Sequence, residues 1–192
     1  MKHILFENLI PDSYSSTILS EFNNLSWQFT DSASGVENNY DKNNKNIKDS
    51  VQFVHPIFDK DPLSSIYSLV YPILWFFEKE AGYNIVDVLR IKANSLTRDG
   101  EDLRYQPPHI DMASAGYHSL IYYINDSDGD TILFNEDLYH GHDNLTECTR
   151  ITPTKGSAVL LPSHLFHSSS CPIDSKRRLV INFIIKLESC SI

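Results

Sequence analysis

The feature that most constrains the fold is a series of short apolar segments in the second half of the chain. Each segment is rich in Ile, Val, Tyr and Phe and is bounded by Gly, Pro, Asn or Asp, a pattern typical of β-strands. Several such strands within about 100 residues favour a sandwich or a jelly roll. The predicted strands cover residues 86–92, 117–124, 131–135, 157–161 and 178–187.

The first half of the chain has a different texture and predicts helices. One helix is expected to begin at Asp12, because apolar side chains then recur at helical spacing. A second is expected to begin at Asp61, which precedes a proline at the first helical position, and to run toward Gly82. Pro72 lies inside this second region and predicts a kink or a break there.

Together these patterns predict an α+β protein with a single domain over residues 1–192. Residues 84–188 are expected to form a jelly-roll (double-stranded β-helix) core. Residues 1–83 are expected to supply a helical buttress and a variable surface loop at 32–49, which is rich in Ser, Asn, Asp and Lys. A chain of this length buries roughly 70% of its unfolded surface, so folding requires neither disulfides nor a metal.

Charge and cysteine usage narrow the choice of partners and compartment. The formal net charge of −9 repels phosphate backbones, so nucleic acid is a poor default partner. Cys148, Cys171 and Cys190 include no pair at C-x-x-C spacing, which fits free thiols in a reducing compartment. The N-terminus has no signal-peptide pattern, and the longest apolar-rich segment is too short to span a bilayer. We therefore expect a cytoplasmic protein without a membrane anchor; its oligomeric state stays open.

One H-x-D pair, His109 and Asp111, is a candidate for metal binding. On a strand, residues i and i+2 point the same way, and one imidazole with one carboxylate makes two of the three ligands of a non-haem iron(II) centre. A surface histidine beside a loop aspartate is the alternative interpretation. His164 and His167 are candidates for the third ligand; we prefer His167, because small serine residues follow it and leave room for a metal.

Arg178 stands at the head of an otherwise apolar predicted strand. If its guanidinium points inward it needs a partner, and a carboxylate held bidentately is a natural one. The alternative is a solvated basic run with Lys176 and Arg177. Asn182 shares a strand face with Arg178, which favours a polar pocket wall.

Four motifs, taken in order, resemble one known family. They are YQPPHID at residues 105–111, LIYYIN followed by DGDT at 120–131, PTKGSAV at 153–159, and a histidine followed eleven residues later by an arginine. This order resembles the prolyl 4-hydroxylase-like branch of the iron(II)/2-oxoglutarate dioxygenases, over roughly half of the chain. Asp130 stands where that branch carries a second glycine.

The resemblance implies an oxidoreductase that hydroxylates a peptide or small-molecule substrate, with peptidyl proline as one candidate. The implied cofactor is Fe(II); the implied co-substrate is 2-oxoglutarate, which is released as succinate and CO2, and ascorbate is a candidate reductant. The implied iron ligands are His109, Asp111 and His167; the implied ligands of the distal carboxylate of 2-oxoglutarate are Arg178 and Tyr123; weaker candidates for the co-substrate pocket are Asn94 and Asn182.

Alternatives from other functional classes remain open at this point. The runner-up is a non-catalytic jelly-roll binding module, which has no need for three metal ligands and Arg178 together; further alternatives are a cupin-type metal enzyme that does not use 2-oxoglutarate and a zinc hydrolase. A second histidine group, at residues 140–143, is interpreted as a solvated loop, and residues 137–149 are expected to border the pocket together with the loop at 32–49. A serine hydrolase is disfavoured because no glycine elbow surrounds Ser168.

Overall fold

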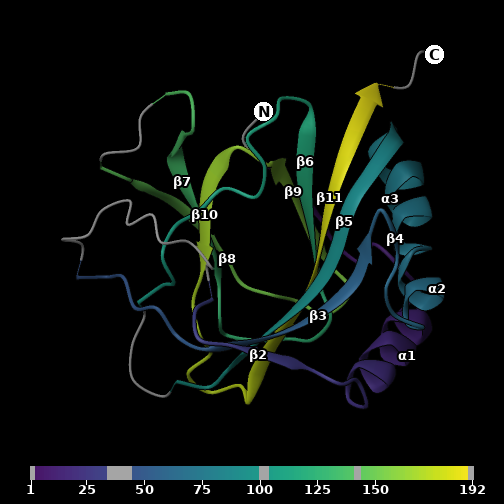
Figure 1. The fold of residues 1–192 in the computed structure, drawn as a ribbon, viewed down its shortest axis with the longest axis horizontal. Coiled ribbons are helices and arrows are strands. Elements are labelled where there is room, and N and C mark those ends of the chain that lie inside the picture. Colours follow the sequence, from purple (N-terminus) through teal and green to yellow (C-terminus); the bar gives the residue numbers. More distant parts are fainter. Residues whose placement is uncertain (1–2, 34–44, 100–103, 141–143, 190–192) are drawn as a thin grey trace.

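Two antiparallel β-sheets face each other, and three helices lie against the outer face of the larger sheet (Figure 1). The computed structural model describes residues 3–33, 45–99, 104–140 and 144–189. None of the helices in these ranges is long and apolar enough to cross a lipid bilayer.

The larger sheet runs in the order β1-β9-β6-β11-β5-β3-β2, with β4 paired to β3 at one side. Its central strands are the long β5 and β11, which pair along almost their whole length. The strands are β1 (Ile4–Phe6), β2 (Gln28–Thr30), β3 (Gln52–Asp59), β4 (Asp61–Pro62), β5 (Tyr83–Thr97), β6 (Tyr117–Tyr123), β9 (Ala158–Pro162) and β11 (Arg177–Ser189). The smaller sheet has the order β10-β7-β8, with β7 (Thr131–Asp137), β8 (Glu147–Ile151) and β10 (Leu165–Ser169).

Strand β11 separates two environments, because alternate side chains of a strand point to opposite faces. Leu179, Ile181 and Phe183 are completely buried in the main core, against the helices. Val180, on the other face, belongs to a smaller cluster between the two sheets. Burial of each large apolar side chain contributes about 1.5–3 kcal/mol, so the helix-facing side of the sheet carries most of the stability.

The helices follow the sequence signals closely, with one exception. Helix α1 (Asp12–Phe22) buries its apolar stripe on the sheet, and α2 (Tyr67–Val70) is separated from α3 (Ile73–Ala81) at Pro72, as predicted. Gly82 ends α3 with a φ of 68°, a left-handed conformation that glycine adopts without steric penalty. The expected helix start at Asp61 is wrong, since Asp61–Pro62 pairs with the end of β3 and the helix begins only at Tyr67.

The five predicted strands are all present, as β5, β6, β7, β9 and β11, and the α+β jelly-roll class is confirmed. The N-terminal part is not purely helical, however, because β1, β2, β3 and β4 join the larger sheet. Most of the predicted surface loop at 32–49 lies outside the described residues.

Candidate metal centre

His109 and His167 lie side by side because their backbones pair. The His109 amide donates to the His167 carbonyl at 2.9 Å, and the His167 amide donates to the His109 carbonyl at 3.0 Å. Gln106 continues the ladder by donating to the carbonyl of Ser169 at 2.8 Å. The segment before the H-x-D motif therefore extends the edge of the smaller sheet next to β10, and places the two imidazole rings 4.6 Å apart.

Asp111 is held by contacts at both its backbone and its carboxylate. Its amide donates to the carbonyl of Ser163 at 2.9 Å. Its Oδ2 accepts hydrogen bonds from the hydroxyl of Ser119 at 2.6 Å and from Nδ2 of Asn182 at 3.0 Å. Its Oδ1 lies 3.3 Å from Nη2 of Arg90. A carboxylate fixed by several donors keeps one orientation, which is how residues behind a metal ligand position it.

His109, Asp111 and His167 together offer three ligand atoms that all lie within 4.8 Å of one another. The Nδ1 atoms of the two histidines lie 3.3 Å from the Pro107 carbonyl and 3.0 Å from the Leu165 carbonyl. Hydrogen bonds to these carbonyls favour a hydrogen on Nδ1, so Nε2 is the atom of each imidazole that is directed toward a metal.

The electrostatics of this group favour a neutral His109 and an ionised Asp111, the protonation states in which these side chains bind a metal. Burial and the neighbouring His167 lower the pKa of His109 to about 4, so its imidazole is neutral near pH 7. Burial alone would raise the pKa of Asp111, but the hydrogen bond and charge of His167 and the charge of His109 hold it well below its usual range. The pKa of His167 is raised, because its contact with Asp111 outweighs the effect of burial. The raised pKa means that a proton on His167 is stabilised by the Asp111 carboxylate. A divalent cation bound between the two side chains would replace this proton.

The structure places His167, the histidine preferred from the sequence, beside His109 and Asp111. His167 faces Asp111, with Nε2 at 3.4 Å from Oδ2, whereas the ring of His164 packs on Tyr139 with centroids 5.0 Å apart. One detail of the prediction is wrong: His109 and Asp111 do not lie on a regular strand. His109 forms an isolated bridge and Asp111 lies in a bend, so backbone pairing with β10 orients His109, and the hydrogen bond to Ser163 positions Asp111.

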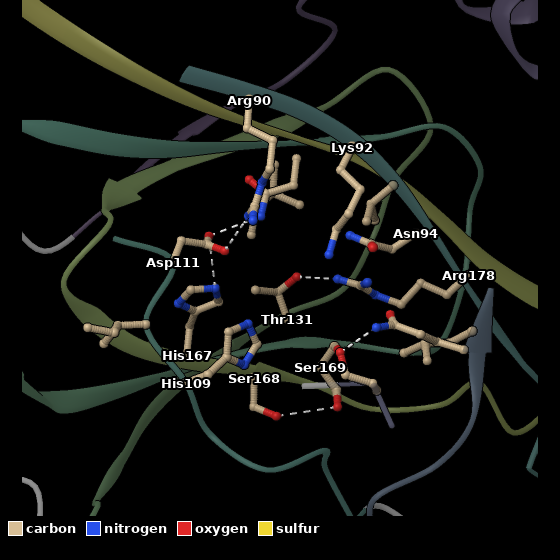
Figure 2. Close-up of a pocket in the computed structure, with 17 residues that line it drawn as sticks. Arg90, Lys92, Asn94, His109, Asp111, Thr131, His167, Ser168, Ser169 and Arg178 are labelled. Carbon is tan, nitrogen blue, oxygen red and sulfur yellow. Dashed lines mark hydrogen bonds and ion pairs between the residues drawn. The ribbon is translucent and has the colours of Figure 1, made fainter. Parts of the chain in front are cut away.

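Arg178 is buried between the sheets and points toward the cavity (Figure 2). Its Nε donates to the carbonyl of Gly129 at 2.9 Å and its Nη2 donates to the hydroxyl of Thr131 at 2.6 Å. Burial lowers the pKa of Arg178, but a guanidinium stays charged at any physiological pH. No described carboxylate forms an ion pair with it; its hydrogen bonds go to neutral groups, the charge of Asp130 acts on it without direct contact, and a bound anion would stabilise it.

Tyr123 occupies a position one layer behind the cavity wall. Its hydroxyl donates to Oγ1 of Thr131 at 2.8 Å, and the guanidinium carbon of Arg178 lies 5.9 Å from its ring centre. Burial raises the pKa of Tyr123, so its hydroxyl remains a donor. Thr131 and Arg178 line the cavity, and Tyr123 contacts both from behind.

The cavity has a volume of about 150 Å³, space for one small organic molecule, and is lined by both sheets. Strand β5 contributes four alternate residues, Arg90, Lys92, Asn94 and Leu96. The two basic residues among them were missed at the sequence level, because a charged side chain on a strand looks solvent-facing until the strand is placed. The sequence did contain one indication: Arg90 and Lys92 are spaced by two residues from Asn94, so on a strand all three side chains point to the same face.

Several buried polar atoms along this cavity have no hydrogen-bond partner within the part of the chain that the structure describes. They are Nε of Arg90 and the side-chain oxygens of Asn94 and Asn182. Unpartnered buried polar groups are rare in proteins and point to an occupant that the protein atoms do not supply.

The second histidine group is not part of this centre. His140 lies on the surface, and its Nδ1 contacts Oδ1 of Asp137 at 2.8 Å. Residues 141–143 lie outside the described residues, as does part of the segment 137–149 expected at the pocket border.

Comparison with solved structures gives the fold a context. An oxidoreductase of the 2OG-Fe(II) oxygenase family from Burkholderia pseudomallei superposes with a TM-score of 0.67 at 12% identity, covering 96% of this chain and 84% of that one. The epimerase SnoN from nogalamycin biosynthesis, in complex with Fe3+, α-ketoglutarate and nogalamycin RO, gives 0.63 at 10% identity, with 96% and 78% covered. A Pseudomonas putida prolyl-4-hydroxylase gives 0.55 at 10% identity, with 96% and 91% covered.

The fold is that of the 2-oxoglutarate- and iron(II)-dependent oxygenases. At 10–12% identity these likenesses establish the architecture, and the chemistry has to be argued from the side chains. No protein-family model matches the chain, and no curated protein does either.

Proposed function

We propose that the protein is an iron(II)- and 2-oxoglutarate-dependent oxygenase. The observation that carries this proposal is one cavity with a His-Asp-His group at one side and a buried, anion-free guanidinium at another (Figure 2). In this proposal His109, Asp111 and His167 hold the iron, and Arg178 binds the distal carboxylate of 2-oxoglutarate.

The donor set fits iron(II). Two neutral imidazoles and one carboxylate with open positions form the facial triad of non-haem iron(II) oxygenases. Ligand atoms about 2.1 Å from a metal at right angles stand about 3 Å apart. The contact of 3.4 Å between His167 and Asp111 is already near that spacing, and the whole group fits within 4.8 Å.

The cavity fits a small dicarboxylate. Arg90, Lys92 and Arg178 line it, against a single acidic residue, Asp111. A planar guanidinium binds a carboxylate through two parallel hydrogen bonds, and Arg178 is held in place for this by Gly129 and Thr131. Tyr123 supports this arrangement from behind by donating to Thr131.

When bound, iron(II) with 2-oxoglutarate supplies oxidation of a C–H bond by O2, with succinate and CO2 as co-products. The protein's own groups hold and enclose these reactants. Ser119 and Asn182 keep the Asp111 carboxylate oriented, and Arg178 fixes the co-substrate by its far end. The apolar wall of Leu96, Ile121 and Val180 limits access of water to the cavity.

The primary substrate and the outcome of the oxidation are the open part of this proposal. Hydroxylation of a peptide or a small molecule is the reaction we expect, with peptidyl proline as one candidate because one similar structure is a prolyl-4-hydroxylase. Another similar structure is an epimerase, so the fold also accommodates oxidations that do not end in hydroxylation. The proposal includes ascorbate as a reductant of the iron and the cytoplasm as the compartment.

The direct test is formation of succinate from 2-oxoglutarate in the presence of iron(II) and O2, without added substrate. The wild type is expected to form succinate, and His109→Ala and His167→Ala are expected to lose both this activity and the visible charge-transfer band that iron(II) and 2-oxoglutarate give without oxygen. His164→Ala is the matched control, because His164 lies next to β10 but faces Tyr139. Loss in His164→Ala with retention in His167→Ala would refute the ligand assignment.

The alternatives predict no succinate in this assay, and they differ in how an activity of their own would respond to Arg178→Ala and to oxygen. A non-catalytic binding module forms no succinate. A cupin-type metal enzyme does not need the guanidinium, so Arg178→Ala leaves its activity intact. A zinc hydrolase is indifferent to oxygen.

A further inference from the structure

The cavity is lined by more cationic side chains than the binding of one distal carboxylate requires. Arg178 faces it from β11, and Arg90 and Lys92 face it from β5 (Figure 2). Among the described lining residues Asp111 is the single carboxylate, and it belongs to the proposed metal-ligand group. If the metal and the distal carboxylate of 2-oxoglutarate occupy the positions proposed above, Lys92 still lacks an ion-pair partner among the described residues, and Arg90 still has a nitrogen without an acceptor.

Lys92 is the clearest case. No described residue forms a hydrogen bond or an ion pair with its ammonium group, although the side chain points into the cavity. Burial lowers the pKa of Lys92, and the charge of neighbouring Arg90 lowers it further. The Asp111 carboxylate opposes this effect, but it is already paired with Arg90, so a bound anion would further stabilise the Lys92 ammonium.

Arg90 adds a second unused donor. Its Nη2 contacts Oδ1 of Asp111 at 3.3 Å, but its Nε is buried without an acceptor. The guanidinium therefore has hydrogen-bonding capacity beyond its contact with the carboxylate.

The strand register places the backbone of Lys92 opposite Asn182, whose amide donates to Asp111, whereas the backbone of Arg178 lies opposite Leu96. Four residues along a strand correspond to about 13 Å, so the two cations enter the same cavity from separate points of the sheet, and Lys92 enters from beside the metal-ligand group.

We propose that Lys92 and Arg90 form a second anion subsite beside the metal, which binds a carboxylate group. The inference rests on the proposed function of the metal centre. Two sources supply this chemistry: the carboxylate of 2-oxoglutarate next to its keto group, or an acid group on the primary substrate. In the second case the substrate is an anionic molecule rather than a neutral peptide segment.

The first arm of the test measures 2-oxoglutarate binding by calorimetry, with Mn(II)-loaded protein. Wild type is compared with Lys92→Met, with Lys92→Arg, which keeps the charge, and with the control Lys155→Met, which removes a surface charge paired with Asp12. If 2-oxoglutarate fills the subsite, Lys92→Met weakens its binding about tenfold or more, and Lys92→Arg restores most of the loss.

The second arm uses protein saturated with Mn(II) and 2-oxoglutarate, with acetate and acetamide as probes of equal size. If the subsite awaits an acid group of the substrate, Mn(II) broadens the methyl proton signal of acetate more than that of acetamide. Lys92→Met abolishes this difference, and Lys155→Met keeps it.

The inference is overturned if Lys92→Met changes neither 2-oxoglutarate binding nor acetate broadening. If 2-oxoglutarate does not bind to the Mn(II)-loaded wild type at all, the proposed function fails and the inference fails with it. Normal binding of 2-oxoglutarate without any effect of Lys92 leaves the proposed function standing and removes the subsite alone.

Discussion

Arg178 and Thr131 are joined by a hydrogen bond of 2.6 Å from Nη2 to the threonine hydroxyl, across 47 positions in the sequence. This contact links the first residues of β11 to those of β7 and holds the guanidinium on the cavity side. Its effect is to keep a positive charge ready in a place that the protein's own carboxylates do not neutralise.

Replacement of Arg178 by alanine should therefore weaken 2-oxoglutarate binding. A lost hydrogen bond to a charged group corresponds to about 1.5–3 kcal/mol, or about 10- to 150-fold in affinity. Calorimetry with metal-loaded protein measures the change. Arg177→Ala is the neighbouring control, because Arg177 contacts Asn23 and not the cavity. Equal affinities for the two variants would contradict the role given to Arg178.

Gly129→Ala should disturb the same guanidinium through sterics alone. A Cβ at this position would lie 2.7 Å from the Ser170 carbonyl oxygen and 3.2 Å from Cδ of Arg178, so the backbone has to move. Such overpacking lowers stability by about 1–3 kcal/mol. We expect a lower midpoint of urea unfolding together with weaker 2-oxoglutarate binding. Gly116→Ala, where the nearest atom is Cε of Lys186 at 3.8 Å but the φ of 85° strains any side chain, should also lower the unfolding midpoint while leaving 2-oxoglutarate binding unchanged.

Replacement of two neighbouring residues of β11, Ile181 and Asn182, should affect two different properties, stability and metal affinity. Ile181 is completely buried in the main core, so Ile181→Ala is expected to lower the free energy of unfolding by about 2–5 kcal/mol. Asn182 donates to the Asp111 carboxylate, so Asn182→Ala should instead weaken metal binding about 10- to 100-fold. Denaturant unfolding of the metal-free proteins and metal titration measure the two effects. The separation of faces would be disproved if Ile181→Ala lost metal affinity with its stability unchanged.

The carboxylate of Asp128, next to Gly129 in the sequence, should make the free energy of unfolding depend on pH. Its Oδ2 accepts from the amides of Ile173 and Asp174 at 2.8 and 2.7 Å, and its Oδ1 accepts from that of Ser175 at 2.9 Å. Burial opposes the effect, but these hydrogen bonds hold the pKa of Asp128 well below its usual range.

Because the pKa is lower in the folded state, this stabilisation is complete above the unfolded pKa of about 3.9 and is lost as the pH falls toward the folded value. Asp128→Asn should therefore be less stable than wild type at pH 7, by about 1 kcal/mol, and the difference should shrink below about pH 4. Urea unfolding at a series of pH values checks this. A difference that grows on acidification would contradict it.

The strands of the second half could be predicted because each carries its own local signal. Segments such as 117–124 and 178–187 combine β-branched and aromatic residues with clear boundaries. β3 was missed because Pro56 interrupts its pattern, and the register with β5 shifts just after it. Asp61–Pro62 has the composition of a helix start, but tertiary pairing with β3 takes precedence over that local preference.

The candidate site was predictable only in part, for a related reason. The H-x-D motif and Arg178 are recognisable from residue type and order, whereas Arg90 and Lys92 acquire meaning only when β5 is seen to face the cavity. The position of Tyr123 behind Thr131 also depends on packing between the sheets, which no local pattern encodes.

The mutual backbone pairing of His109 and His167 has a consequence for biosynthesis. His109, the first proposed ligand, is translated long before His167, the third, and until β10 exists the backbone hydrogen bonds that His167 provides to His109 cannot form. A nascent chain therefore leaves the ribosome without a finished chelating pocket, and capture of the metal has to follow closure of the smaller sheet. Prematurely terminated products that stop short of β10 would carry the H-x-D motif and still be poor scavengers of cellular iron.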